Sequence, residues 1–162
     1  MPPDTPNAGP EEALYRPALA VAFAEADKAA GRGEVPIGAA LVESATGKIL
    51  AAAGNETIAR SDPTAHAEIL VIRAEAAARR AQRLPDCSLV VTLEPCAMCA
   101  AAISFARIQT VLFAAPDAKG GAVWHGPRFY GQPTCHWRPA VIGGVEAERS
   151  AALLKAFFRA RR

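Results

Sequence analysis

The chain has 162 residues, of which 51% are hydrophobic and 21% are charged. These values suit one globular domain and exclude a chain that is mainly disordered. No apolar run approaches the roughly 18 residues that a membrane-spanning helix needs, so we expect no membrane segment. The formal charge is +2, but residues 138–162 alone hold six basic and two acidic side chains. This basic end either faces solvent or attracts a polyanion.

The first half of the chain predicts a tail, a helix and a hairpin. Residues 1–10 are rich in proline and lack a basic, apolar leader, so we expect a disordered tail, no secretory signal and a cytoplasmic protein. A single domain is expected over 11–162. A helix over 11–30 would have to place Pro17 in its first turn. Apolar runs at 37–42 and 48–53 predict a β-hairpin, and a polar loop follows.

The second half alternates between predicted helices and strands. Helices are expected over 65–83, 96–107 and 147–162, and strands over 88–93, 110–113 and 141–142. Residues 115–139, between the last two of these strands, predict a long loop that is either functional or mobile. This order predicts a three-layer α/β/α sandwich with a central mixed sheet of about five strands. The helices near His66 and Cys96 would both begin at the sheet edge where such folds bind ligands.

Four residues form a pattern typical of a metal site. Cys96 and Cys99, at i and i+3 on a helix start, project their sulfurs to one side, and the helix N-terminus favours thiolates. His66 supplies a nitrogen, and this donor set suits tetrahedral zinc. Three protein ligands leave one position open for a water molecule, as in catalytic zinc sites. Glu68 points away from His66 on an ideal helix and is better placed as a proton carrier.

Three other interpretations of these residues are open. A structural zinc site needs a fourth ligand, for which Cys87 is the obvious candidate. However, the strand between Cys87 and Cys96 would hold them on the order of 20 Å apart. A redox pair of Cys96 and Cys99 would leave the histidine and the glutamate without a role. A non-catalytic, zinc-stabilised module that binds nucleic acid predicts four protein ligands and no bound water.

The histidine–glutamate and cysteine motifs together resemble the H-x-E…P-C-x-x-C signature of the zinc nucleobase deaminases. Within the cytidine-deaminase-like superfamily, the chain is similar to the bacterial tRNA-specific adenosine deaminases. The resemblance covers nearly everything from residue 11 onward. It rests on Asn55 and on the runs at 33–39, 62–69, 91–100, 117–119 and 157–162. Residues 120–136 follow a variant of the family pattern.

The resemblance implies a zinc-dependent hydrolase that deaminates adenosine to inosine at wobble position 34 of a tRNA anticodon. It implies one zinc ion per subunit, bound by His66, Cys96 and Cys99, with Glu68 shuttling protons and no organic cofactor. The implied partners are the tRNA anticodon stem-loop and a second copy of the chain in a homodimer. The implied substrate-binding residues are Asn55, the backbone at Ala67, Phe157, Phe158 and Arg159.

Some of these residues carry further expectations. Phe157 and Phe158 are neighbours and cannot share one helix face, so we expect one in the core and the other as a stacking surface for RNA. Arg159 would contact phosphate. Glu94 is expected to hydrogen-bond and fix a loop rather than to catalyse. The rival enzyme with the same zinc site is a deaminase of a free base or nucleoside, such as guanine or cytosine.

Overall fold

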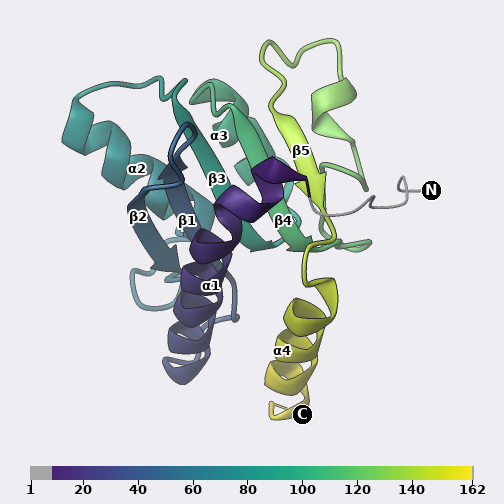
Figure 1. Cartoon of the computed structure of the whole chain (residues 1–162). Coiled ribbons are helices and arrows are strands. Elements are labelled where there is room, and N and C mark those ends of the chain that lie inside the picture. The colour runs from purple at the N-terminus through teal and green to yellow at the C-terminus, as the bar shows by residue number, and fades with distance from the viewer. Residues whose placement is uncertain (1–8, 162) are drawn as a thin grey trace.

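The computed structural model describes residues 9–161, which form a five-stranded mixed sheet covered by helices on both faces (Figure 1). The strands are β1 (Gly38–Glu43), β2 (Ile49–Gly54), β3 (Cys87–Leu93), β4 (Thr110–Ala115) and β5 (Ala140–Gly143). The helices are α1 (Pro10–Gly31), α2 (Ala67–Arg79), α3 (Ala97–Phe105) and α4 (Ala147–Arg159), with a short 3-10 turn at Phe129–Gly131. The predicted α/β/α sandwich is confirmed, and β3 is the central strand.

The direction of the strands determines where a site can form. In the spatial order β2-β1-β3-β4-β5, β1 is antiparallel to both neighbours, whereas β3, β4 and β5 are parallel. All strands except β1 therefore end at the same edge of the sheet. Because α2 follows β2 and α3 follows β3, both helices begin at this edge, as the sequence predicted. Ligands bind at the carboxyl edge in open α/β sheets.

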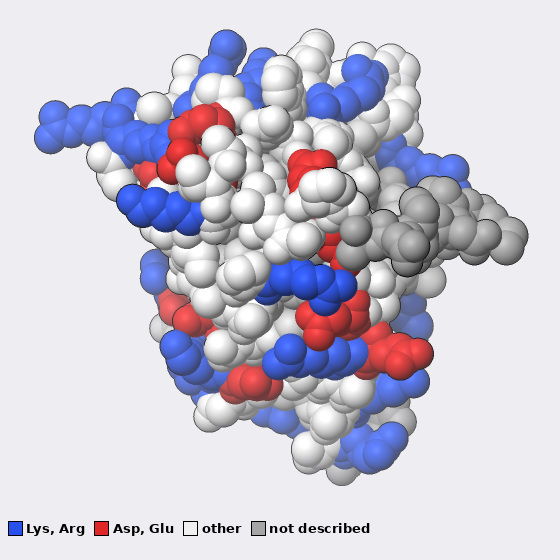
Figure 2. All heavy atoms as spheres, viewed as in Figure 1, with Lys and Arg blue, Asp and Glu red and all other residues white. Residues whose placement is uncertain are grey.

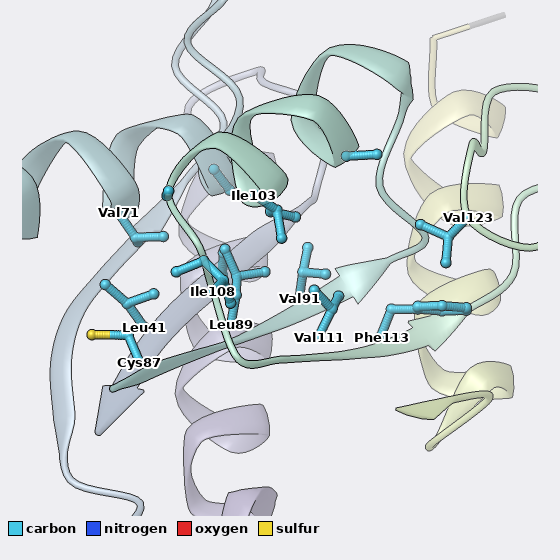
Figure 3. Close-up of a cluster of buried hydrophobic side chains, with 14 of the residues drawn as sticks. Leu41, Val71, Cys87, Leu89, Val91, Ile103, Ile108, Val111, Phe113 and Val123 are labelled. Atoms are coloured by element: carbon cyan, nitrogen blue, oxygen red, sulfur yellow. The ribbon is translucent and has the colours of Figure 1, made fainter. Parts of the chain in front are cut away.

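Side chains on the central strand alternate between two hydrophobic clusters. Leu89 and Val91 pack beneath α2 and α3, where they meet Val71 and Ile103 (Figure 3). Val90, between them, faces the opposite side, which α1 and α4 cover. Burial on both faces explains why the middle of β3, residues 89–91, is apolar throughout rather than alternating.

The helix α1 lies unusually close to the hairpin, because both surfaces carry small residues. A Cβ atom added at Gly38 would lie 1.8 Å from the carbonyl oxygen of Ala22, and one added at Gly54 would lie 2.5 Å from that of Glu25. The buried face of α1 includes Ala22, Ala26 and further alanines. The alanine-rich composition of the helix therefore permits this close packing.

Two sequence predictions about helices need correction. Pro17 lies inside the 22-residue α1 rather than in its first turn, because the helix already begins at Pro10. Tertiary packing of the buried α1 face outweighs the hydrogen bond that Pro17 cannot donate. The helix α2 ends four residues before residue 83, since Arg80 adopts a left-handed conformation and caps it.

The remaining predicted boundaries are within two residues of the observed ones, except for the end of α4 at Arg159. Residues 1–8 of the predicted tail, and residue 162, lie outside the described residues. None of the helices described over 9–161 is long and apolar enough to cross a membrane.

Candidate metal centre

The predicted metal ligands lie where two helices begin at the carboxyl edge of the sheet. His66 is the N-cap residue of α2, Cys96 is the N-cap residue of α3, and Cys99 lies in the first turn of α3. Neither N-cap side chain forms a capping hydrogen bond, and the His66 ring lies against the Cys96 sulfur instead. The positive end of each helix dipole favours negative charge at this point, including thiolates.

The distances between the ligand atoms fit tetrahedral zinc. Nδ1 of His66 lies 3.7 Å from Sγ of Cys96 and 3.5 Å from Sγ of Cys99, and all three atoms lie within 4.8 Å of one another. With ordinary zinc bond lengths of about 2.3 Å to sulfur and about 2.0 Å to nitrogen, tetrahedral ligands lie about 3.6 Å apart. The donor set therefore matches zinc both in chemistry and in spacing. The sequence had predicted a histidine nitrogen without distinguishing Nδ1 from Nε2.

Hydrogen bonds within this cluster redistribute its protons. A hydrogen bond from the Cys99 thiol lowers the pKa of Cys96 to about 4, and His66 adds to the effect. The same bond raises the pKa of Cys99, together with burial. The bond with Cys96 also raises the pKa of His66. Cys96 is thus the more acidic of the two thiols, and a divalent cation would favour both thiolates by displacing their protons.

Glu68 lies beside the centre and outside the group of three side chains that could hold a metal ion, and its predicted role as a proton carrier stays a prediction. It is the second residue of α2, and its side chain is only 4% exposed. Burial raises the pKa of Glu68, although a hydrogen bond with its own backbone and one with Cys99 oppose that effect. A buried carboxyl that takes up a proton more readily than an ordinary glutamate is suited to proton transfer.

The alternative of a closed, four-ligand site does not agree with the geometry. Cys87 begins β3, whereas Cys96 follows the opposite end of that strand, and among residues 9–161 the metal-binding group contains only the three predicted ligands. Three side chains would therefore hold a metal ion here, the number that is typical of catalytic zinc sites.

Two of the predicted substrate-binding residues are bonded to each other next to His66. Oδ1 of Asn55, a buried residue immediately after β2, accepts a 2.9 Å hydrogen bond from the backbone N–H of Ala67. This bond joins the end of β2 to the first turn of α2. Contact of either residue with a base remains a prediction.

The other predicted substrate-binding residues lie on α4. Phe157 is 8% exposed, with the guanidinium group of Arg161 3.5 Å from its ring centre, whereas Phe158 is 49% exposed. The expectation that one phenylalanine is buried and the other exposed is confirmed. Phe158 lines a hollow of about 700 Å³, together with Lys119, Leu154, Lys155, Arg159 and Arg161. Figure 2 shows mixed charge on the face in view, with basic side chains at the end of the molecule where α4 finishes.

Sequence reasoning missed the role of a buried glutamate on one side of the centre. Glu34 accepts hydrogen bonds from the backbone N–H groups of Ile58 and Ala59, at 3.0 and 2.8 Å, and from the hydroxyl of Thr57. These bonds fix the loop between β2 and α2. The available signal was an acidic residue just before an apolar strand, at the left-handed turn of Gly33.

Glu94 has the corresponding role on the other side, and here the expectation of a loop-fixing residue is confirmed. Its buried carboxylate accepts hydrogen bonds from four backbone N–H groups between Asp117 and His125. Burial by itself would raise the pKa of Glu94, but these bonds and the His125 ring lower it below its ordinary value. The carboxylate is therefore kept charged by the loop that surrounds it.

Comparison with known proteins identifies the class of this centre. Residues 14–115 match the family model described as the cytidine and deoxycytidylate deaminase zinc-binding region. The match covers more than half of the chain and includes the three ligands and Glu68. The chain therefore belongs to this family of zinc deaminases.

Individual relatives show which kinds of deaminase the chain is similar to. The chain is 52% identical over 144 residues to a tRNA-specific adenosine deaminase of Agrobacterium fabrum, which covers 89% of this chain and 93% of that protein. A solved structure from a study of A-to-I editing by tRNA:A34 deaminases at the wobble position is also 52% identical. Its TM-score is 0.82, and the match covers 85% of this chain and 98% of that one. A guanine deaminase from Nitrosomonas europaea shares the fold at 23% identity and a TM-score of 0.71, over 93% and 85% of the two chains.

Proposed function

We propose that the protein is a zinc-dependent deaminase that converts adenosine to inosine at the wobble position, 34, of a tRNA anticodon. One observation carries the proposal. A three-ligand centre with a buried glutamate beside it occurs in a chain that is 52% identical, over 89% of its length, to a tRNA-specific adenosine deaminase. The donor atoms of His66, Cys96 and Cys99 support one zinc ion per subunit.

The buried carboxyl of Glu68 performs the proton transfers of this reaction. A zinc ion held at the centre would supply the Lewis acidity that makes a water molecule nucleophilic near neutral pH. Glu68 accepts a proton from the water as its oxygen bonds to C6 of adenine, and gives that proton to the ring nitrogen. It then takes the second proton from the new C6 hydroxyl and gives it to the amino group, which leaves as ammonia when the C6–N bond breaks. Adenosine and water are thereby converted to inosine and ammonia. The raised pKa of Glu68 supports its cycling between the two protonation states.

Residues around the centre would bind the substrate. We assign the border of the base pocket to Asn55 and the backbone at Ala67, which are held beside His66 by their mutual hydrogen bond. Phe158 provides a stacking surface for a base, and Arg159 contacts phosphate. Phe157 contributes to substrate binding indirectly. It is buried in the core and so fixes the end of α4, on which Phe158 lies.

A deaminase of free guanine or cytosine would share the zinc centre but would have no use for a basic hollow. The test is to incubate zinc-loaded protein separately with a tRNA carrying adenosine at position 34, free adenosine, guanine and cytidine. We expect inosine to form only in the tRNA. The affinity of the protein for this tRNA should fall steeply as the salt concentration rises. Ammonia released from guanine or cytidine, without inosine in the tRNA, would instead support the free-base deaminase.

We also infer that the enzyme is a cytoplasmic homodimer that binds the anticodon stem-loop. Two large apolar side chains, Phe105 on α3 and Ile58 in the loop before α2, are 73% and 69% exposed, and such surface suits burial against a second copy. A reducing compartment would keep the two cysteine ligands from forming a disulfide. Sedimentation equilibrium tests the dimer, and a monomer at micromolar concentrations would contradict it.

A further inference from the structure

The loop after β4 is built around a single buried side chain, that of Glu94. Oε2 accepts hydrogen bonds from the backbone N–H groups of Val123, Trp124 and His125, at 3.2, 3.1 and 3.1 Å. Oε1 accepts one from the N–H of Asp117 at 3.0 Å and lies 2.8 Å from Nδ1 of the His125 ring. Five polar groups of one loop thus converge on one carboxylate, and only a charged, acceptor-only group can satisfy all of them.

The fit around this carboxylate is tight. A Cβ atom added at Gly121 would lie 2.2 Å from Oε2 of Glu94 and 2.5 Å from the carbonyl oxygen of Asp117. The loop is also bonded to the segment that precedes the metal ligands, since the N–H of Ala122 donates to the carbonyl of Pro95 at 2.9 Å. Any other side chain at Gly121 would therefore displace either the carboxylate or the loop.

The loop in turn fixes the position of a lysine. Oδ1 of Asp117 accepts hydrogen bonds from the N–H groups of Lys119 and Gly120, both at 3.0 Å, while the N–H of Asp117 is itself bonded to Glu94. Lys119 lines the same hollow as Phe158 and Arg159 of α4. A chain of contacts therefore connects the buried carboxylate to one wall of the hollow.

We propose that Glu94 is a positioning residue for RNA: its carboxylate shapes the 117–125 loop so that Lys119 and the basic side chains of α4 form one phosphate-binding wall. This inference rests on the proposed function, because it assumes that the hollow binds tRNA. It predicts that the lysine binds phosphate only when the loop is wrapped around the carboxylate. The contrasting role, support of the adjacent ligand Cys96, would affect zinc retention instead.

A double-mutant cycle separates these two roles. We would measure the affinity of the zinc-loaded full chain for an anticodon stem-loop by fluorescence anisotropy at several salt concentrations. The variants are Lys119→Ala, Glu94→Gln and Gly121→Ala, with each of the last two also combined with Lys119→Ala. Zinc content and thermal unfolding are measured for each variant. Gly121→Ala perturbs the same carboxylate without changing any charge. Gly131→Ala, in the 3-10 turn that follows the loop, is the matched control, because no heavy atom lies within 4 Å of the added Cβ.

We expect Lys119→Ala to weaken binding roughly two- to fivefold, as for one exposed ion pair. The slope of log affinity against log salt should fall by about 0.7 to 0.9, as for one lost phosphate contact. Glu94→Gln and Gly121→Ala should produce the same loss with zinc retained, and Lys119→Ala should then have no further effect in either background. The control should bind as the wild type does.

The proposal is overturned if the losses from Glu94→Gln and Lys119→Ala add, or if Glu94→Gln loses zinc while its RNA affinity is unchanged. Should Glu94→Gln not fold, the same cycle with His125→Ala decides, since that substitution removes only one donor, from a partly exposed side chain. The inosine assay separately tests the proposed tRNA deaminase function. If the wild-type protein makes inosine but the losses in the cycle add, only the positioning role of Glu94 is rejected.

Discussion

The substitution Glu68→Gln separates the catalytic use of this carboxyl from its effect on stability. The side chain is 4% exposed, and burial raises its pKa, so the charged form is disfavoured in the folded protein. Glutamine has almost the same shape, carries no charge and cannot transfer a proton between water and a departing amino group. We therefore expect turnover to be lost while the folded state becomes no less stable.

The expected magnitudes follow from these contacts. General acid–base catalysis contributes about 10²–10⁴-fold per group, so we expect kcat to fall by roughly 10³-fold or more, because Glu68 acts in more than one proton transfer. Replacing a functional group that is unfavourable for folding commonly stabilises a protein by about 0.5–2 kcal/mol. For a chain of this size, each kcal/mol raises Tm by roughly 2–4 °C.

The stability gain should depend on pH in a defined direction. Above the ordinary glutamate value of 4.5, the unfolded chain loses the proton of Glu68 while the folded chain still holds it. The free energy of unfolding of the wild type therefore declines as pH rises from that value towards the raised pKa, and the glutamine variant lacks this decline. A nearby cation favours the carboxylate, so the difference should be largest in metal-free protein.

The assays are inosine formation in an anticodon stem-loop, zinc content, and thermal unfolding from pH 5 to pH 8 with and without chelator. Glu75→Gln is a matched control on the same helix, because Glu75 pairs with Arg79, lies outside the metal-binding group and should leave turnover unchanged. A Glu68→Gln variant that retains more than a tenth of wild-type turnover, or that is less stable than the wild type at every pH, would refute the reasoning.

Three further predictions can be measured on the same protein. Removing zinc with a chelator should abolish turnover and lower Tm, and both should return when zinc is added back, since the ligands join two helices. Phe157→Ala should destabilise the fold by about 3 kcal/mol in urea unfolding, whereas exposed Phe158→Ala should leave stability unchanged but weaken RNA binding by about 1–3 kcal/mol. Gly38→Ala should destabilise by about 3 kcal/mol or more because its Cβ would meet the Ala22 carbonyl, whereas Gly31→Ala meets no atom within 4 Å and should be nearly neutral.

The features that were predictable from the sequence depend on short-range patterns. The apolar run of β3, the helices on either side of it and the spacing of Cys96 and Cys99 each follow from a few neighbouring residues. Together they predicted that His66 and Cys96 would meet at one sheet edge, and the structure confirms this. The end of α2 was not predictable in the same way, because no local pattern required Arg80 to adopt a left-handed conformation.

The contacts that hold the loops depend on residues distant in the chain. Glu34 bonds to amides about 24 residues later, and Glu94 to amides up to 31 residues later. No periodicity or spacing rule relates a glutamate to amides at such separations. Sequence reasoning therefore assigned a loop-fixing role to Glu94 without identifying its partners, and missed Glu34.

The buried carboxylates of Glu34 and Glu94 have a practical consequence for the redesign of the two loops beside the metal centre. Each irregular segment beside the metal centre is ordered by amide groups that surround a carboxylate, and not by apolar contacts alone. Exchanging one of these segments while keeping its acid would leave a negative charge buried without donors, and removing the acid would leave several amides without an acceptor. A loop exchange that is meant to alter substrate preference should therefore transfer the glutamate together with the loop that surrounds it.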